Sequence, residues 1–176
     1  MQKNAYLKIA VLTFLFLSCN KNAITKQDID NFISENEKIS FSCLKNVTIV
    51  QRSSNLNNIV YAVGRYSGNL PVYIVTYSLK EEKVTKIDKS ILRSARINDY
   101  LTECEIYSAI KMTRSKDFFL LAVDSLGNVF INPFQFNSPP YFLRLQNKSK
   151  AKTVRYGYIY ELYKNNWYLN KLRQDN

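Results

Sequence analysis

Hydrophobic and polar residues alternate over most of the chain beyond residue 39, which is the pattern of half-buried β-strands. β-branched and aromatic residues dominate the alternating stretches, and short polar segments separate them. We therefore expect an α+β fold that is mainly antiparallel β, arranged as a curved meander-type sheet, a sandwich or an open barrel with one or two short helices. The predicted strands are 47–50, 59–63, 72–77, 84–87, 118–123, 129–131, 154–162 and 167–169.

A helical pattern precedes the first predicted strand. Thr25 and Asp28 have the spacing of a capping box, in which each side chain bonds the backbone of the other residue. Apolar residues follow at helical spacing, so we predict a helix from 26 to about 37. Its apolar face consists of Ile29, Phe32 and Ile33.

The segment between the fourth and fifth predicted strands combines two patterns. Asp88 has the position of a helix cap, so a helix is expected within 88–104. Residues 104–112 then alternate well enough to predict a strand. On such a strand Glu103 and Glu105 project from one face.

The last predicted hairpin carries the clearest alternation in the chain. Tyr156, Tyr158 and Tyr160 project from one face of its first strand, and Trp167 lies nearby on the second strand. An exposed aromatic face of this kind can bind sugars or a protein partner. Aliphatic residues at both ends of the same face favour the alternative, in which the aromatic side chains pack in the core.

The N-terminal residues have a different composition. Residues 1–8 contain two lysines and no acidic residue, and residues 9–17 are apolar except for one threonine. The apolar run is too short to cross a bilayer as a helix, which takes about 20 residues. A basic start, a short apolar core and a small residue before a polar break are features of an export signal. Here the break follows Phe16-Leu17-Ser18-Cys19.

Leu17-Ser18-Cys19 resembles the lipobox of bacterial lipoproteins, although Phe16 departs from the more usual Leu or Val. This resemblance covers residues 1–19 only. It implies that Cys19 is acylated and becomes the new N-terminus, which anchors the protein to a lipid membrane. Asn20, rather than Asp, follows the cysteine, which in this class favours the outer membrane on its periplasmic side. The alternative is an ordinary secreted protein in which Cys19 has no special role.

These features predict three parts in the chain. A signal peptide is expected at 1–18, a lipidated tether at 19–24, and a single β-rich periplasmic domain at 25–176. Four glycines and four prolines are too few for a long flexible linker, and 46% hydrophobic residues suffice for a core.

Two cysteines remain if Cys19 is acylated. Cys43 and Cys104 form an even pair in an oxidising compartment, so a disulfide between them is predicted. Such a bridge closes a loop of about 60 residues and contributes roughly 4 kcal/mol in the chain-entropy model. The alternative is a pair of buried, reduced thiols.

The chain is strongly basic, with 25 Lys and Arg against 14 Asp and Glu, a net charge of +11. Removing residues 1–18 takes away two lysines and no acid, which leaves +9. This surplus favours a protein or anionic envelope partner, and Lys148, Lys150 and Lys152 form a candidate basic loop. A solvated surface explains the same residues more simply. The export signal disfavours nucleic acid as the partner.

The sequence lacks the residues of the common catalytic sites. It contains no histidine, which excludes Ser-His-Asp and Cys-His pairs and most zinc enzymes. No phosphate-binding glycine motif is present, and we expect neither a cofactor nor a metal. The carboxylate pairs Glu103 with Glu105 and Glu81 with Glu82 are the remaining candidates for hydrolysis of envelope glycosides.

These observations predict a non-enzymatic, membrane-anchored envelope lipoprotein that binds another envelope macromolecule. An alternative function is an immunity or inhibitor lipoprotein that neutralises a periplasmic toxin or hydrolase. A carboxylate-based envelope hydrolase is the third hypothesis.

Overall fold

The computed structural model describes residues 24–66, 70–147, 152–155 and 157–173. The chain divides into two compact units between Glu37 and Lys38, which we describe separately. The first unit contains helix α2 (Lys26–Asn36), as predicted. Thr25 caps it with a capping box, in which the Thr25 N–H donates to the Asp28 carboxylate at 2.8 Å. The predicted apolar face is buried at Ile29, Phe32 and Ile33.

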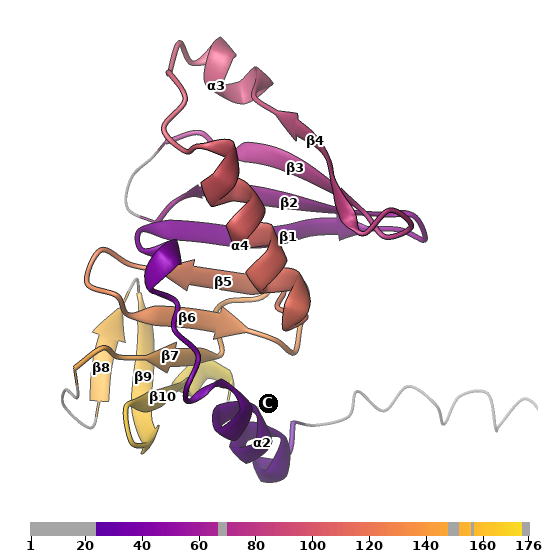
Figure 1. Cartoon of the computed structure of the whole chain (residues 1–176). Coiled ribbons are helices and arrows are strands. Elements are labelled where there is room, and N and C mark those ends of the chain that lie inside the picture. Colours follow the sequence, from indigo (N-terminus) through magenta and orange to yellow (C-terminus); the bar gives the residue numbers. More distant parts are fainter. Residues whose placement is uncertain (1–23, 67–69, 148–151, 156, 174–176) are drawn as a thin grey trace, which may run out of the picture. The chain divides into compact units, whose positions relative to one another are not determined.

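Within the described residues, the second unit is one open sheet of ten antiparallel strands (Figure 1). The predicted α+β class, mainly antiparallel β, is confirmed. The strand order is β4-β3-β2-β1-β5-β6-β7-β10-β9-β8. The strands are β1 (Val47–Ser54), β2 (Asn58–Arg65), β3 (Tyr73–Ser78), β4 (Lys83–Asp88), β5 (Leu120–Val123), β6 (Val129–Asn132), β7 (Phe142–Arg144), β8 (Lys152–Arg155), β9 (Tyr158–Lys164) and β10 (Trp167–Asn170).

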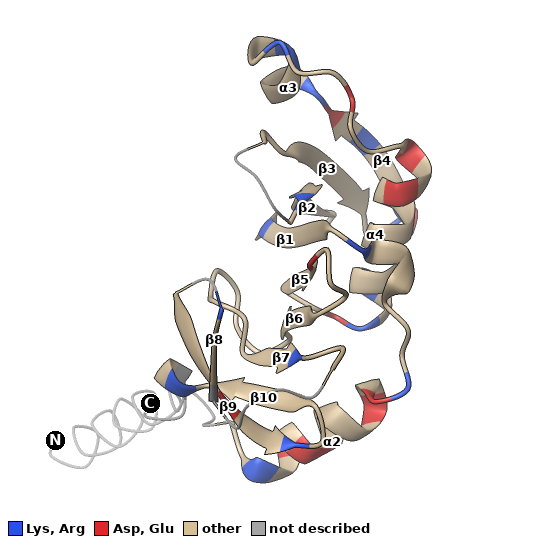
Figure 2. Ribbon diagram, turned by 90° about the vertical axis from the view of Figure 1, so that its left-hand side faces the viewer, with Lys and Arg blue, Asp and Glu red and all other residues tan. Residues whose placement is uncertain are grey.

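Strands β1–β4 form what we call the N-terminal wing, in which burial alternates along the strands. On one face Ile49, Tyr61 and Val75 are buried, and helix α4 (Glu103–Ser115) lies across this face (Figures 1 and 2). On the other face the cross-strand neighbours Val50, Ala62 and Ile74 are only half-buried. The alternation therefore reflects a sheet with one covered face and one open face.

Strands β5–β10 form the C-terminal wing, in which β6 and β10 are buried on both faces. Every residue of β6 and β10 is buried. β8 lies on the side of the sheet opposite α4, so the wing curls back on itself (Figure 2). The Phe130 ring stacks on Tyr66 at 5.2 Å between centroids and meets Tyr160 edge-on at 6.2 Å. The core of this curl consists of Ala122, Phe130, Leu143, Leu145, Tyr160 and Tyr168.

The strand predicted at 104–112 is wrong, because this segment is helix α4. Thr102 and Glu105 form a second capping box at its start. Helical spacing separates the buried residues, which are Ile106, Ala109, Ile110 and Thr113. Some apolar residues of this segment also lie at every second position, which by chance resembles the alternation of a strand. The helix expected within 88–104 is present but short, as α3 (Ser90–Ser94).

The strand predicted at 154–162 is also wrong, because two antiparallel strands, β8 and β9, occupy it. Gly157 lies between them with a φ of 79°, a left-handed conformation that suits glycine and turns the chain back. β7 was not predicted, since three residues are too short to establish an alternating pattern. The short 3₁₀ turns η1 (Ser42–Leu44) and η2 (Lys171–Arg173) complete the structure.

The predicted disulfide between Cys43 and Cys104 is absent, since both thiols are free and exposed. The wrong secondary structure explains the error. On a strand Cys104 shares the inward face of Ile106, whereas on helix α4 the two positions lie about 200° apart around the axis. Ile106 is buried, so Cys104 faces outward.

Candidate functional site

The described residues line a pocket of about 380 Å³, open to solvent on one side, at the end of the N-terminal wing where β1 turns into β2. This volume lies at the lower end of the range for small-molecule sites. The β1–β2 hairpin, the turn after β3 and the C-terminal end of α4 form its walls. The lining residues are Gln51, Ser54, Asn55, Ile59, Leu79, Arg114, Asp117 and Phe119.

The wall formed by the β1–β2 hairpin is fixed by its own hydrogen bonds. The Asn55 side-chain oxygen accepts the backbone N–H groups of Asn57 at 2.9 Å and Asn58 at 2.8 Å. The Leu79 N–H donates to the Asn57 carbonyl at 2.8 Å, which ties this turn to the end of β3. A register shift between Gln51 and Ser53 adds a bulge at the same place, a feature that often redirects side chains beside binding sites.

The opposite wall is fixed where α4 ends. Asp117 has a φ of 51°, and the Phe118 N–H donates to the Thr113 carbonyl at 3.1 Å, as in a Schellman helix end. The Phe119 N–H donates to the Asn132 carbonyl and its own carbonyl accepts the Gln51 N–H, both at 2.9 Å. The pocket is therefore preformed between two rigid walls.

Arg114 is the charged centre of this pocket. Its guanidinium carbon lies 5.5 Å from the centre of the Tyr77 ring, a cation–π contact. Its Nη1 is 3.2 Å from the Asp117 carboxylate, and the two side chains are 29% and 85% exposed. Burial raises the pKa of the nearby Tyr61 hydroxyl, and the Arg114 charge only partly opposes this. The guanidinium is thus held in place and can bind an anion.

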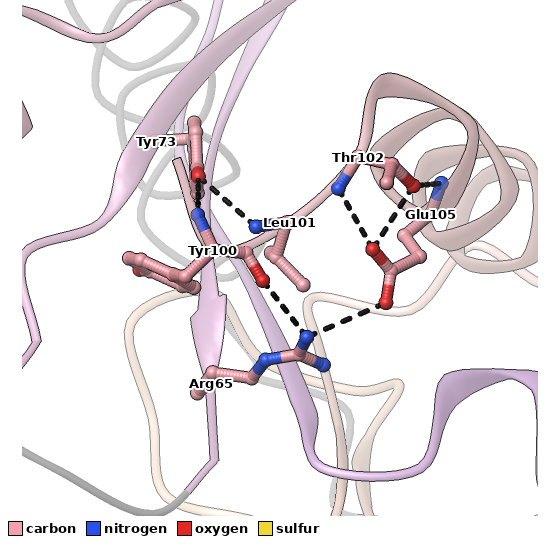
Figure 3. A network of polar contacts seen from close by, with 6 residues as sticks. All are labelled: Arg65, Tyr73, Tyr100, Leu101, Thr102 and Glu105. Carbon is pink, nitrogen blue, oxygen red and sulfur yellow. Dashed lines mark hydrogen bonds and ion pairs between the residues drawn. The ribbon is translucent and has the colours of Figure 1, made fainter. Parts of the chain in front are cut away.

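A second polar group lies at the other end of α4 (Figure 3). The Tyr73 hydroxyl accepts the backbone N–H groups of Tyr100 at 2.8 Å and Leu101 at 3.1 Å. Arg65 donates to the Tyr100 carbonyl at 2.8 Å and lies 3.5 Å from the Glu105 carboxylate. These contacts join the segment before α4 to β2 and β3, so we assign the group a structural role.

The carboxylate pairs considered for hydrolysis are not brought together in the way the sequence suggested. A hydrogen bond from the Thr102 backbone lowers the pKa of Glu105. A general acid must hold a proton before the reaction, so a lowered pKa makes Glu105 unsuited to that role. Glu103 is two positions away on the same helix and is exposed. Glu81 is paired with Lys83 at 2.8 Å, and Glu82 occupies the turn position with a φ of 50°.

The aromatic residues proposed for binding do not share one face. Tyr160 and Trp167 are fully buried, and Tyr158 is half-buried. Asn170 is opposite Tyr160 and Tyr168 is opposite Leu162, so alternate residues of β10 share the face of Tyr160. Trp167, one residue from Tyr168, therefore lies on the other face. Trp167 packs there edge-on against the Phe142 ring, 5.9 Å away, and Tyr156 lies outside the described residues.

Most of the remaining candidate residues lie outside the described part of the chain. Cys19, Lys148 and Lys150 lie outside the described residues, and Lys152 is the first residue of β8. No group of three His, Cys, Asp or Glu side chains suited to a metal occurs in the part of the chain that is described. None of the described helices is both long and apolar enough to span a membrane.

Sequence reasoning missed the pocket around Arg114. Its lining comes from residues 51 to 119, and no local motif marks them as neighbours. Comparison with known protein families, curated proteins and solved structures gave no significant match.

Proposed function

We propose that the protein is a non-enzymatic lipoprotein of the bacterial envelope, anchored through acylated Cys19, that binds another envelope macromolecule. The lipobox-like Leu17-Ser18-Cys19 behind a short apolar run is the observation that carries this proposal. The outer membrane on its periplasmic side is the favoured location. More than one acyl chain on a single cysteine holds a protein firmly to a bilayer.

Two features support recognition rather than catalysis. Glu105 serves the cap of α4 and the contact with Arg65, so its carboxylate has a structural use. The pocket combines apolar and amide side chains with one guanidinium, whose nearest carboxylate, Asp117, is paired with it and largely exposed. This lining is a binding surface rather than an arranged acid and base. The positive charge of the chain favours a protein or anionic partner.

Mass spectrometry of the N-terminal peptide tests the anchor. The full-length gene is expressed in a Gram-negative host, and the protein is recovered from the membrane fraction. We expect a chain that begins at Cys19 and carries fatty acyl groups. The Cys19→Ala variant should lose the acyl groups and leave the membrane fraction. An intact Met1, or an unchanged location of the variant, would refute the anchor.

Chemical cross-linking in intact cells tests the binding role. We expect one reproducible complex of the anchored protein with an envelope component, and less of it with Cys19→Ala. If the partner is a toxin or a hydrolase whose activity the protein blocks, the inhibitor function replaces the more general role. A chain that is recovered only in uncross-linked form contradicts a binding function.

A further inference from the structure

We infer that the pocket at Arg114 binds an apolar carboxylate, with the anion on the guanidinium and the apolar group against Ile59, Leu79 and Phe119. This inference goes beyond the proposed function, because it names a ligand chemistry and does not depend on the lipid anchor. The carboxylate can belong to a small molecule or to the C-terminal residue of a polypeptide.

The Arg114 guanidinium is the group in the pocket that can hold an anion, and Asp117 is the carboxylate that occupies it in this structure. Arg114 is the one cationic side chain among the lining residues, and its Nη1 is 3.2 Å from Asp117. Asp117 is 85% exposed, so this pair is largely screened by solvent and exchanges easily for another carboxylate. The Arg114 side chain is only 29% exposed, so a ligand carboxylate that forms two parallel hydrogen bonds with the guanidinium can compete with the single contact to Asp117.

The guanidinium is prepared for this exchange by its other contacts. The Tyr77 ring lies 5.5 Å from its central carbon, a contact that does not involve Asp117. The Arg114 Nε has no hydrogen-bond partner among the described residues, so one donor of the guanidinium is unsatisfied. The Tyr77 contact can therefore hold Arg114 while one anion replaces another, which lowers the cost of ordering the site.

The rest of the lining matches a small apolar group with one polar attachment. Ile59, Leu79 and Phe119 supply an apolar surface, and Gln51 and Ser54 supply an amide and a hydroxyl. Gln51 is about nine-tenths buried, so a ligand amide or carbonyl that bonds its side-chain amide does so with little competition from water. A single guanidinium without a lysine in the lining fits one negative charge better than a phosphate dianion.

Isothermal titration calorimetry on the full-length protein tests the inference with defined probes. N-acetyl-L-leucine supplies a carboxylate, an amide and a branched apolar side chain, and N-acetyl-L-leucinamide is the same molecule without the charge. We expect saturable binding of the acid in the millimolar range and at least about tenfold weaker binding of the amide. A short peptide that ends in leucine, with a free or an amidated C-terminus, distinguishes a polypeptide source. If the peptide with a free C-terminus binds and N-acetyl-L-leucine does not, the natural ligand is the C-terminal end of a polypeptide.

Two substitutions in the pocket should act in opposite directions. Arg114→Gln should weaken binding of the acid at least about tenfold, because the charged donor is lost. Asp117→Asn should strengthen binding about two- to fivefold, because the competing carboxylate is gone. The control Arg93→Gln removes an exposed charge from α3 and should leave affinity unchanged.

The Asp117→Asn variant keeps the test decisive even if Arg114→Gln fails to fold. Equal affinity for acid and amide, or weaker acid binding in Asp117→Asn, overturns the inference. The absence of saturable heat with any probe up to about 20 mM does the same. None of these results bears on Cys19, so they are separate from a failure of the proposed anchor.

Discussion

The two wings of the sheet are stabilised in different ways. The C-terminal wing buries both faces of β6 and β10 and holds an aromatic core inside its curl. The N-terminal wing has one face under α4 and one open face, and polar contacts fix the segment that leads into the helix. In one continuous sheet, the C-terminal wing is thus stabilised by side-chain packing on both faces. The N-terminal wing is stabilised by packing on one face and by hydrogen bonds. The pocket lies in the second region.

The largest expected effect comes from the packed wing. Trp167 is fully buried between Phe142 and Arg144, so Trp167→Ala should lower the free energy of unfolding by about 3–5 kcal/mol. Ile74→Ala on the open face of the other wing should cost only about 1 kcal/mol, since Ile74 is half-buried. Urea denaturation of both variants measures the two losses. Equal losses would show that the two wings do not differ in the way the burial suggests.

An intermediate effect is expected from the polar contacts of the N-terminal wing. Tyr73→Phe keeps the ring but removes the acceptor of the Tyr100 and Leu101 N–H groups, so the free energy of unfolding should fall by about 2 kcal/mol. Amide hydrogen exchange should quicken at those two residues first. Tyr77→Phe is the control, because its ring still lies beside Arg114 and the change should be nearly neutral. A neutral Tyr73→Phe would mean that packing alone holds this segment.

The smallest effect concerns the turn from β4 into α3. A hydrogen bond from the Ser90 backbone, at 2.8 Å, together with the nearby Lys86, lowers the pKa of Asp88 to about 2. The ionised form is therefore favoured in the folded protein, and its contribution to stability is full above the ordinary pKa near 4. That contribution is lost as pH falls from about 4 to about 2.

Carbon-detected NMR of the Asp88 carboxyl should show a titration midpoint near 2 rather than near 4. In Asp88→Asn the acid-dependent loss of stability over that pH range should be slightly smaller than in the parent chain. An ordinary midpoint would contradict the hydrogen bond to Ser90.

The sequence predicted the strands of the N-terminal wing better than those of the C-terminal wing. One covered face makes burial alternate, so the residue pattern marks β1, β2 and β3 as strands. In the C-terminal wing β7 has too few residues for a pattern, and the turn at Gly157 divides one alternating stretch into β8 and β9. The apolar residues of helix α4 also satisfy an alternation over a short window, so they predict a strand.

The candidate site was harder to predict than the fold. The cap of helix α2 can be predicted from Thr25 and Asp28, because a capping box depends on two residues three positions apart. The pocket depends on the end of α4 reaching the β1–β2 hairpin, which brings Arg114 beside Gln51. That juxtaposition follows from strand order and helix placement, and neither is encoded in a local motif.

Among the described residues, β4 and β8 are the edge strands of an open sheet, and an exposed edge strand can pair with a strand of another chain. On β4, Lys83 and Lys86 are exposed, and each is paired with an acidic side chain, Lys83 with Glu81 and Lys86 with Asp88. A second copy docking along this edge would have to strip these charged side chains of water. Charged side chains on an edge strand thus disfavour the addition of a strand from a neighbouring molecule, even at high local density.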